Sequence, residues 1–457
     1  MNFKSYPEYK DSGVPWLGDV PKHWELWKTK YLFKERVQKG FPNEPLLAAT
    51  QTKGVVPKTQ YETRTVTAQK DFHLLKLVKK GDFVISLRSF QGGIEFAYYQ
   101  GIISPAYTIM IPNKEIYGGY FQHLAKSKVF VKLLTTCVTG IREGQNIDYE
   151  ILKRKQIPIP SLTEQTHIAR FLDYKTAQIG RFIKAKKRMI ELLKEQKQVI
   201  INDAVTGKID VATGKPYPKY KDSGVEWLGQ IPCDWNMKTI KRICHNINEQ
   251  TNTKLADENY IALENVEGWS GKIILPKEEV KFESQVKRFR ENDILFGKLR
   301  PYLAKVVRPL FKGVCVGEFL VLRKTTHEIN ERFLEYKLRS KEIISTINQS
   351  TFGAKMPRAD WGFIGNLKFS FPVQEEQQQI ISYIEIQTAA LDLAISRTER
   401  EITLMQEYRT RLISDVVTGK IDVRDITIPD IIESVDEDDE DEEKNSEEVE
   451  ESESIDE

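Results

Sequence analysis

The chain has 457 residues, 40% of them hydrophobic and 29% charged, which is the composition of a globular protein with room for two or three domains. It contains no run of eighteen apolar residues, and its first nine residues hold no apolar segment, so we expect no membrane span, no secretory signal and a cytoplasmic location. The four cysteines form no CxxC pair, which fits a reducing compartment and argues against a zinc site.

The net charge of +2 conceals two unlike regions. Residues 430–457 contain 17 acidic residues and one lysine; the rest of the chain has 67 Lys and Arg against 49 Asp and Glu, an excess of 18 positive charges. A body this basic suits a polyanion such as DNA, although simple solubility also explains the charge. The acidic end has no periodicity, and we expect it to be disordered.

The chain opens with a segment that is repeated later. Tyr9–Trp24 returns as Tyr220–Trp235, and the sequence VTGKIDV, which begins at Val205, returns unchanged at Val417. The offsets are 211 and 212 residues, so one unit of about 210 residues is duplicated.

Each unit begins with β-branched and aromatic runs broken by Gly and Pro, at 24–160 and 235–372, which indicates a mixed α/β domain. In both domains a predicted strand precedes a predicted amphipathic helix, at 102–112 and 120–136 in the first and at 314–324 and 332–348 in the second.

A long helix follows each domain. The first is predicted by the capping-box pattern at Ser161–Glu164 directly after a proline, has no proline through Thr206, and ends at Gly207. Its counterpart is predicted over 376–418 and ends at Gly419.

The apolar positions of both helices follow alternating steps of four and three residues. They are Ile179, Ile183, Ile190, Leu193, Ile200 and Ala204 in the first helix and Leu391, Ile395, Ile402, Met405, Leu412 and Val416 in the second. Polar residues interrupt both seams at matching places, namely Lys186 and Lys197 in the first and Thr398 and Arg409 in the second. We expect the two seams to pair with each other, whereas packing of each helix on its own domain would need a wider apolar face. A rod of roughly 64 Å would then hold the two domains apart.

Catalytic motifs are absent from the sequence. No Gly-Lys pair is followed by Ser or Thr, and the sequence holds no GxGxxG, HExxH or GxSxG motif and no Asn/Asp-Pro-Pro-Tyr/Phe methyltransferase motif. A nuclease-like pattern, Pro429-Asp430 followed by Glu442 and Lys444, lies in the acidic end, where a chance match is easy. We therefore predict no catalytic residue and no metal site in this chain.

Two places in each domain are candidate DNA contacts. A basic turn follows a matched strand, with Arg88 and Gln91 in the first domain and Lys298 and Arg300 in the second. A polar loop precedes each long helix, with Arg142, Gln145 and Asn146 in the first domain and Lys355 and Arg358 in the second. Arginine can grip phosphate or guanine, and Asn or Gln can pair with adenine, although solvated loop residues explain each of these positions equally well.

These motifs resemble the specificity subunit of type I restriction–modification systems. The resemblance rests on Ile157–Gln165, the helix after it, the ending Thr206–Asp210, the lead-ins around Trp16 and Trp227, and the loop 140–148. It covers the chain up to Val423, and almost every motif occurs twice. The loop before the second helix departs from the family pattern, so base contacts cannot be transferred there residue by residue.

The resemblance implies an α+β fold with two mixed α/β target-recognition domains and a pseudo-twofold internal duplication. Two long helices would form an antiparallel coiled coil between the domains. The expected segments are 1–160, the first target-recognition domain; 161–210, a long helix; 211–372, the second domain; 373–423, the second long helix; and 424–457, a disordered acidic tail.

The resemblance also implies that each domain reads one half of a split, asymmetric site in double-stranded DNA. The helices would dock two modification subunits, which bind S-adenosylmethionine and methylate adenine at N6. Restriction subunits would add translocation and cleavage driven by ATP with Mg. This chain would itself bind no cofactor. A stand-alone regulator with two DNA-reading heads and a nuclease acting through the tail motif are the alternatives.

Overall fold

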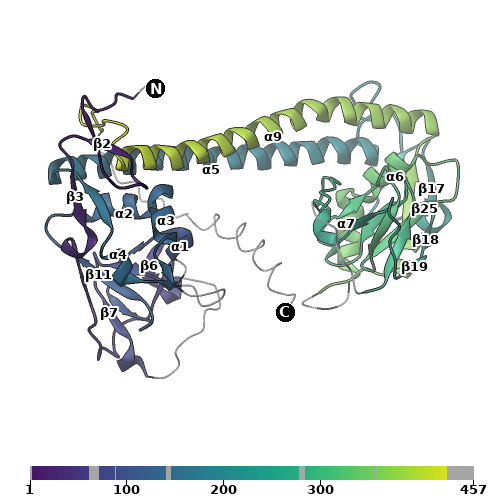
Figure 1. Cartoon of the computed structure of the whole chain (residues 1–457). Helices are drawn as coiled ribbons and strands as arrows, with labels where there is room; N and C mark the ends of the chain where they lie inside the picture. Colours follow the sequence, from purple (N-terminus) through teal and green to yellow (C-terminus); the bar gives the residue numbers. More distant parts are fainter. Residues whose placement is uncertain are drawn as a thin grey trace. The chain divides into compact units, whose positions relative to one another are not determined.

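The computed structural model describes residues 3–60, 71–87, 89–139, 146–276, 284–351, 353 and 356–429. The described parts of Met1–Lys184 and Ile402–Glu457 form one compact unit, and those of Ala185–Glu401 form the other (Figure 1). The units divide both long helices between them, whereas the segments expected from the sequence treat each helix as a separate piece. No helix of the described residues is long and apolar enough to cross a membrane.

The first unit is built on a four-stranded antiparallel sheet in the order β4-β11-β8-β9. Around it lie the hairpin β1–β2 and the antiparallel pairs β3·β14, β5·β6, β7·β10 and β12·β13. The strands are β1 (Tyr9–Asp11), β2 (Asp19–Pro21), β3 (Glu25–Lys28), β4 (Phe33–Glu35), β5 (Leu47–Thr50), β6 (Gly54–Pro57), β7 (Lys76–Val78), β8 (Phe83–Ile85), β9 (Glu95–Phe96), β10 (Gly101–Ile103), β11 (Thr108–Pro112), β12 (Val138–Thr139), β13 (Asn146–Ile147) and β14 (Gln156–Ile159). The short helices are α1 (Ser89–Gly92), α2 (Gly118–Lys126), α3 (Lys128–Thr135) and α4 (Tyr149–Leu152).

The second unit repeats this order and adds a second sheet. A hairpin, β15–β16, is followed by the pair β17·β26, an antiparallel sheet β18-β25-β22-β23, and a sheet β19-β21-β24-β20 in which only β20·β24 is parallel. The strands are β15 (Tyr220–Asp222), β16 (Gln230–Pro232), β17 (Asn236–Thr239), β18 (Cys244–Ile247), β19 (Gln250–Thr251), β20 (Asn259–Ile261), β21 (Val286–Phe289), β22 (Ile294–Gly297), β23 (Val306–Val307), β24 (Gly313–Val316), β25 (Phe319–Lys324) and β26 (Lys368–Phe371). The short helices are α6 (Glu331–Leu338), α7 (Lys341–Gln349) and α8 (Trp361–Asn366).

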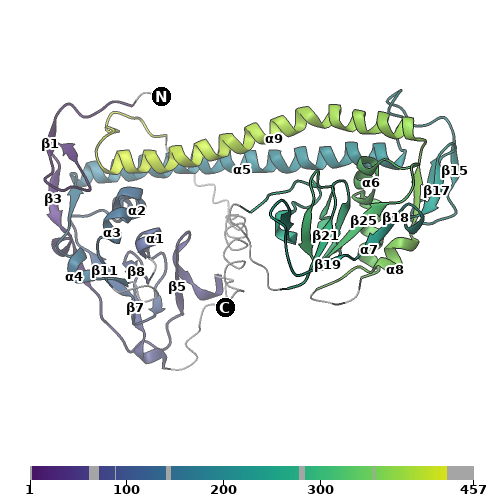
Figure 2. The same cartoon turned by 45° about the vertical axis from the view of Figure 1, so that its right-hand side comes forward.

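The two long helices are α5 (Leu162–Thr206) and α9 (Gln374–Val417). In the first unit the beginning of α5 shares a hydrophobic core with the end of α9, through Phe171 and Val416 among others. In the second unit the end of α5 shares a core with the beginning of α9, through Val205 and Ile384 among others. The helices are therefore antiparallel within each unit, which confirms the predicted pairing (Figures 1 and 2).

The seam residues differ in burial along the helix pair. Ile179, Ile183, Ala204, Ile395, Leu412 and Val416 are buried, while Ile190, Leu193, Ile200, Leu391, Ile402 and Met405 are half-buried. The two lysines that interrupt the seam of α5 form ion pairs with α9, Lys186 with Glu401 at 2.7 Å and Lys197 with Asp392 at 2.5 Å. These two interruptions are therefore cross-helix contacts.

The motif that precedes each long helix ends in a Glu–Gln pair, and this pair joins the start of the helix to its domain. The carboxylate of Glu164 accepts hydrogen bonds from the Tyr6 hydroxyl (2.7 Å) and Trp24 Nε1 (3.0 Å). The carboxylate of Glu376 accepts the matching bonds from Tyr217 (2.5 Å) and Trp235 (2.9 Å). Each glutamate thus fastens its long helix to the lead-in of its own domain.

The glutamine that follows binds backbone on the other side of the helix start. Gln165 Oε1 accepts from the Tyr117 amide at 2.7 Å, and its Nε2 donates to the Pro160 carbonyl at 2.9 Å. Gln377 makes the equivalent bonds to Asn330 and Pro372, both at 2.8 Å.

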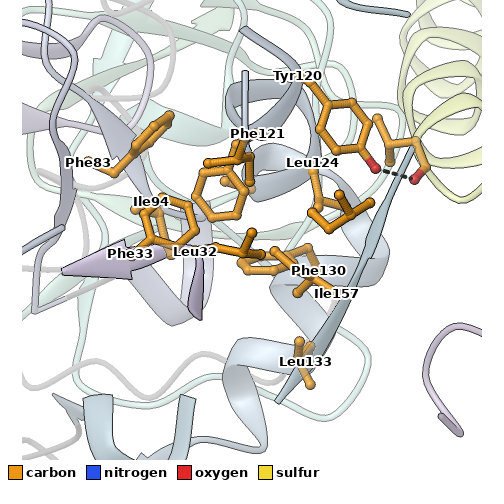
Figure 3. Packing of buried hydrophobic residues seen from close by; sticks show 14 of the residues in the cluster. Leu32, Phe33, Phe83, Ile94, Tyr120, Phe121, Leu124, Phe130, Leu133 and Ile157 are labelled. Carbon is orange, nitrogen blue, oxygen red and sulfur yellow. Dashed lines mark hydrogen bonds between the residues drawn. The ribbon is translucent and has the colours of Figure 1, made fainter. Parts of the chain in front are cut away.

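The core of the first unit is a cluster of aromatic rings under the sheet. The ring of Phe121 lies 4.8 Å from that of Phe83 and 5.8 Å from that of Phe130, each edge to face (Figure 3). The single hydrogen of the buried Tyr120 hydroxyl is shared between the carbonyls of Pro158 (3.0 Å) and Val417 (3.3 Å), which ties the end of α9 to the domain.

In each domain, one strand and one helix that were predicted as continuous elements are each divided into two, and to this extent the predictions are wrong. The strand predicted at 102–112 is divided into β10 and β11 by a turn that contains Pro105, and the strand predicted at 314–324 is divided into β24 and β25. The helix predicted at 120–136 breaks at Ser127, whose extended backbone and hydroxyl cap α3. The helix predicted at 332–348 breaks at Ser340, whose backbone is also extended but whose hydroxyl makes no capping hydrogen bond. Residue periodicity identified each element type but not these breaks.

The segments after the long helices fold back onto the lead-ins. Gly419 has φ +78°, and a Cβ there would lie 2.3 Å from Pro21. Gly207 has φ +77°, and a Cβ there would lie 2.6 Å from Pro232. In the first unit the fold extends past Val423, because Ile426 and Ile428 pack against the core.

Candidate nucleic-acid interface

The two places predicted to contact DNA adjoin each other in the second unit. The carbonyl of Lys298 accepts a hydrogen bond from the Ala359 amide at 2.8 Å, and the Arg300 amide donates to the Pro357 carbonyl at 2.8 Å. Between these bonds, Leu299 forms a β-bridge with Arg358. The basic turn after β22 and the loop before α8 are therefore one two-stranded ribbon, which brings Lys298, Arg300 and Arg358 together.

Arg300 occupies an unusual backbone conformation on this ribbon. Its φ is +49°, in the left-handed region that disfavours residues other than glycine, and its side chain is exposed. The next residues, Pro301–Leu303, form a 3₁₀ turn that leaves the Tyr302 ring exposed. A strained backbone position persists only where the surrounding structure holds it in place. Such positions are frequent at ligand-binding sites.

Beside the ribbon lies a hollow of about 740 Å³. The residues that line it are Asn246, Asn248, Lys287, Lys298, Leu320, Gly353, Met356, Arg358, Ala359, Asp360 and Trp361. Three of these carry a positive charge and one, Asp360, carries a negative charge. The Asp360 carboxylate accepts a hydrogen bond from the Phe363 amide and caps α8.

The two lysines of the hollow lie in different surroundings. Lys287 is only 8% exposed, and its ammonium donates to the Phe319 carbonyl at 2.8 Å. Burial, together with the positive charge of Lys298, lowers the pKa of Lys287. Lys298 is half-buried, and its ammonium has no hydrogen-bond or ion-pair partner among the described residues.

Arg358 is held by a neighbouring acid. Its Nε lies 3.2 Å from the Glu318 carboxylate, and both side chains are partly exposed. An exposed pair of this kind contributes little to stability, but it fixes the direction of the guanidinium.

In the first unit the corresponding places also adjoin. Helix α1, which carries the exposed Gln91, lies against strand β13, which begins with the exposed Asn146. Arg88, Arg142 and Gln145 lie outside the described residues, as does Lys355 of the second unit.

In both units a buried aspartate that is bound by an arginine lies directly before the matched strand. Asp82 receives a two-pronged bond from Arg36, with N–O distances of 2.7 and 3.0 Å. Asp293 receives one from Arg323, at 2.8 and 2.6 Å. Each aspartate also caps the turn before its strand, so these charges serve the fold and are not available to a ligand.

Sequence reasoning missed Lys287 and Asn246, which lie on strands β21 and β18. Both strands hold two adjacent polar residues between apolar ends, Lys287-Arg288 in β21 and His245-Asn246 in β18, and periodicity alone does not say which of them faces a ligand. Among the described residues, no group of three or more His, Cys, Asp or Glu side chains could hold a metal ion. Of the nuclease-like pattern only Pro429 is described; Asp430, Glu442 and Lys444 lie outside the described residues.

Comparison with known proteins agrees with these features. No family model matches the sequence. The chain is 26% identical over 321 residues to the type I restriction enzyme StySPI specificity subunit of Salmonella potsdam, covering 68% of this chain and 67% of that one. It is 21% identical over 370 residues to the MjaVIII specificity subunit of Methanocaldococcus jannaschii, covering 77% of this chain and 81% of that one.

A solved structure shares the fold. It comes from a study of complex assembly and conformational transition of the type I R-M system, and it matches with a TM-score of 0.58 and 13% identity over 88% of this chain and 99% of that one. The resemblance predicted from the motifs is confirmed: the curated relatives of this chain are specificity subunits of type I restriction enzymes.

Proposed function

We propose that this chain is the DNA-recognition subunit of a type I restriction–modification system and that it reads a two-part, asymmetric site. The observation that carries the proposal is the repeated arrangement of the candidate contacts. In each unit the turn after the matched strand adjoins the segment before the long helix, and in the second unit three of the four candidate cations, Lys298, Arg300 and Arg358, lie on one ribbon. Two separate domains of this kind suit two separate half-sites.

In this proposal the chemistry belongs to partner subunits. Two modification subunits would bind S-adenosylmethionine and methylate adenine at N6, and restriction subunits would use ATP and Mg to translocate and cleave DNA. Adenine must leave the duplex before it is methylated, so the subunit that reads the sequence need not hold the active site. The absence of catalytic motifs from the sequence and the names of the relatives, which are specificity subunits, support this division.

The test is to express the chain with and without the modification subunit of its own system in a host that lacks adenine methylation, and to sequence the methylated adenines. We expect a two-part motif with a fixed spacer when both are present and no methylation from either alone. Methylation by the purified chain alone would contradict the proposal. Sequence-specific binding with neither methylation nor co-purification of the partner would favour a stand-alone regulator.

A further inference from the structure

We propose that the hollow lined by Lys298 holds a phosphate of the DNA backbone, so that Lys298 anchors the second domain on DNA while bases are read by Arg300, which lies on the same ribbon but outside the hollow. This inference rests on the proposed function and deepens it, because it divides the candidate contacts of one domain into two roles. The ligand class is a phosphodiester of double-stranded DNA.

The shape of the site favours phosphate over a base edge. Base edges lie inside the grooves of a duplex and are reached by side chains that protrude, whereas the phosphate ridge is convex and fits a concave surface. Lys298 and Lys287 line a hollow, and Lys287 is 8% exposed. Arg300 does not line the hollow and is exposed.

The charge of the hollow also favours an anion. The acids near it are already engaged, Asp360 in capping α8 and Glu318 in its pair with Arg358. The ammonium of Lys298 has no hydrogen-bond or ion-pair partner among the described residues, and that of Lys287 donates to a carbonyl and forms no ion pair, although Glu318 lies close enough to attract it. Two neighbouring lysines without a carboxylate partner repel each other, and a bound phosphate would relieve that repulsion.

The test compares Lys298→Ala, Lys298→Arg and the control Lys368→Ala in the full chain. Lys368 is an exposed lysine of the same domain that does not line the hollow. Binding to duplexes of unrelated sequence is measured over a range of salt concentrations. A lost phosphate contact reduces the slope of log K against log salt by about 0.9 and weakens binding on the order of tenfold at 50 mM salt and a few-fold at 200 mM.

We expect this result for Lys298→Ala on every sequence, a slope close to wild type for Lys298→Arg, and little change for Lys368→Ala. With the modification subunit present, the methylated motif of Lys298→Ala should keep the same bases. An unchanged salt slope, or a relaxed base at one motif position, would overturn the phosphate assignment. A wild-type chain that bound no DNA would instead contradict the proposed function.

Discussion

In the proposed division of roles, Arg300 is the exposed ribbon residue that reads a base. We predict that Arg300→Ala relaxes one position in one half of the methylated motif, because a lost two-pronged contact to guanine costs about 1–3 kcal/mol of discrimination. Gln91→Ala, on α1 of the other unit, should affect only the other half. Sequencing of methylated adenines checks both variants. Equal disturbance of both halves by either substitution would show that the domains do not read independently.

Glu95 makes the stability of the first unit depend on pH. It is 2% exposed, and burial raises its pKa to about 7, although Lys126 lies 2.6 Å away and opposes the shift. Between pH 4.5 and 7 the folded chain therefore holds a proton that the unfolded chain has released, so stability falls as pH rises, by at most about 3 kcal/mol in total. Glu95→Gln cannot ionise and should flatten this dependence.

Urea unfolding at several pH values measures the effect. The exposed Glu8, which pairs with Lys22, supplies a control, and Glu8→Gln should keep the wild-type slope. If Glu95→Gln lost as much stability between pH 4.5 and 7 as the wild type does, burial of Glu95 would not be the cause.

Lys298 and Arg358 show what residue patterns cannot reveal. The sequence marked the turn and the loop as separate candidates, since about sixty residues lie between them. The turn and the loop are joined by backbone hydrogen bonds such as that between Arg300 and Pro357. No local sequence pattern predicts these bonds. For the same reason the sequence could not place Lys287 beside Lys298.

At the scale of elements, the ends of the long helices were predictable because capping residues and glycines mark them locally. The observed start of α5 at Leu162 and its end at Thr206 lie next to Ser161 and Gly207. The break at Ser127 was not predicted, because the apolar period continues across it. Pairing of the seams was predictable from their period, but the ion pairs of Lys186 and Lys197 needed the partner helix in place.

Gly419 links the end of α9 to the first domain, and we predict that Gly419→Ala destabilises the first unit. The substitution combines a strained φ of +78° with a Cβ placed 2.3 Å from Pro21. Gly18→Ala is the matched control, since Gly18 has φ +71° but nothing within 4 Å of its Cβ. Denaturant unfolding should show a loss for Gly419→Ala that exceeds the control by about 1 kcal/mol or more. Equal losses would mean that the close approach to Pro21 carries no energy.

At the scale of the whole molecule, each long helix belongs partly to each unit, so helix length should set the spacer of the DNA site. Inserting seven residues into both helices keeps the seam in phase and adds about 10.5 Å of helix. We expect an active variant to methylate the same half-sites with at most about three extra base pairs between them. An active variant with the old spacer would show that the helices do not fix it. This prediction depends on the antiparallel pairing found within each unit.

The central claim is that each domain alone determines one half of the recognised site. It is tested most directly by placing a second copy of residues 24–160 at positions 235–372, where the Trp and Glu–Gln contacts that hold a domain are the same in both units. The chain is then expressed with its modification subunit, and the methylated adenines are sequenced. Because the two units are expected to be related by a pseudo-twofold axis, the account predicts an inverted repeat, in which both halves are the half-site of the first domain read on opposite strands. A motif that keeps the second half-site of the natural chain would contradict it.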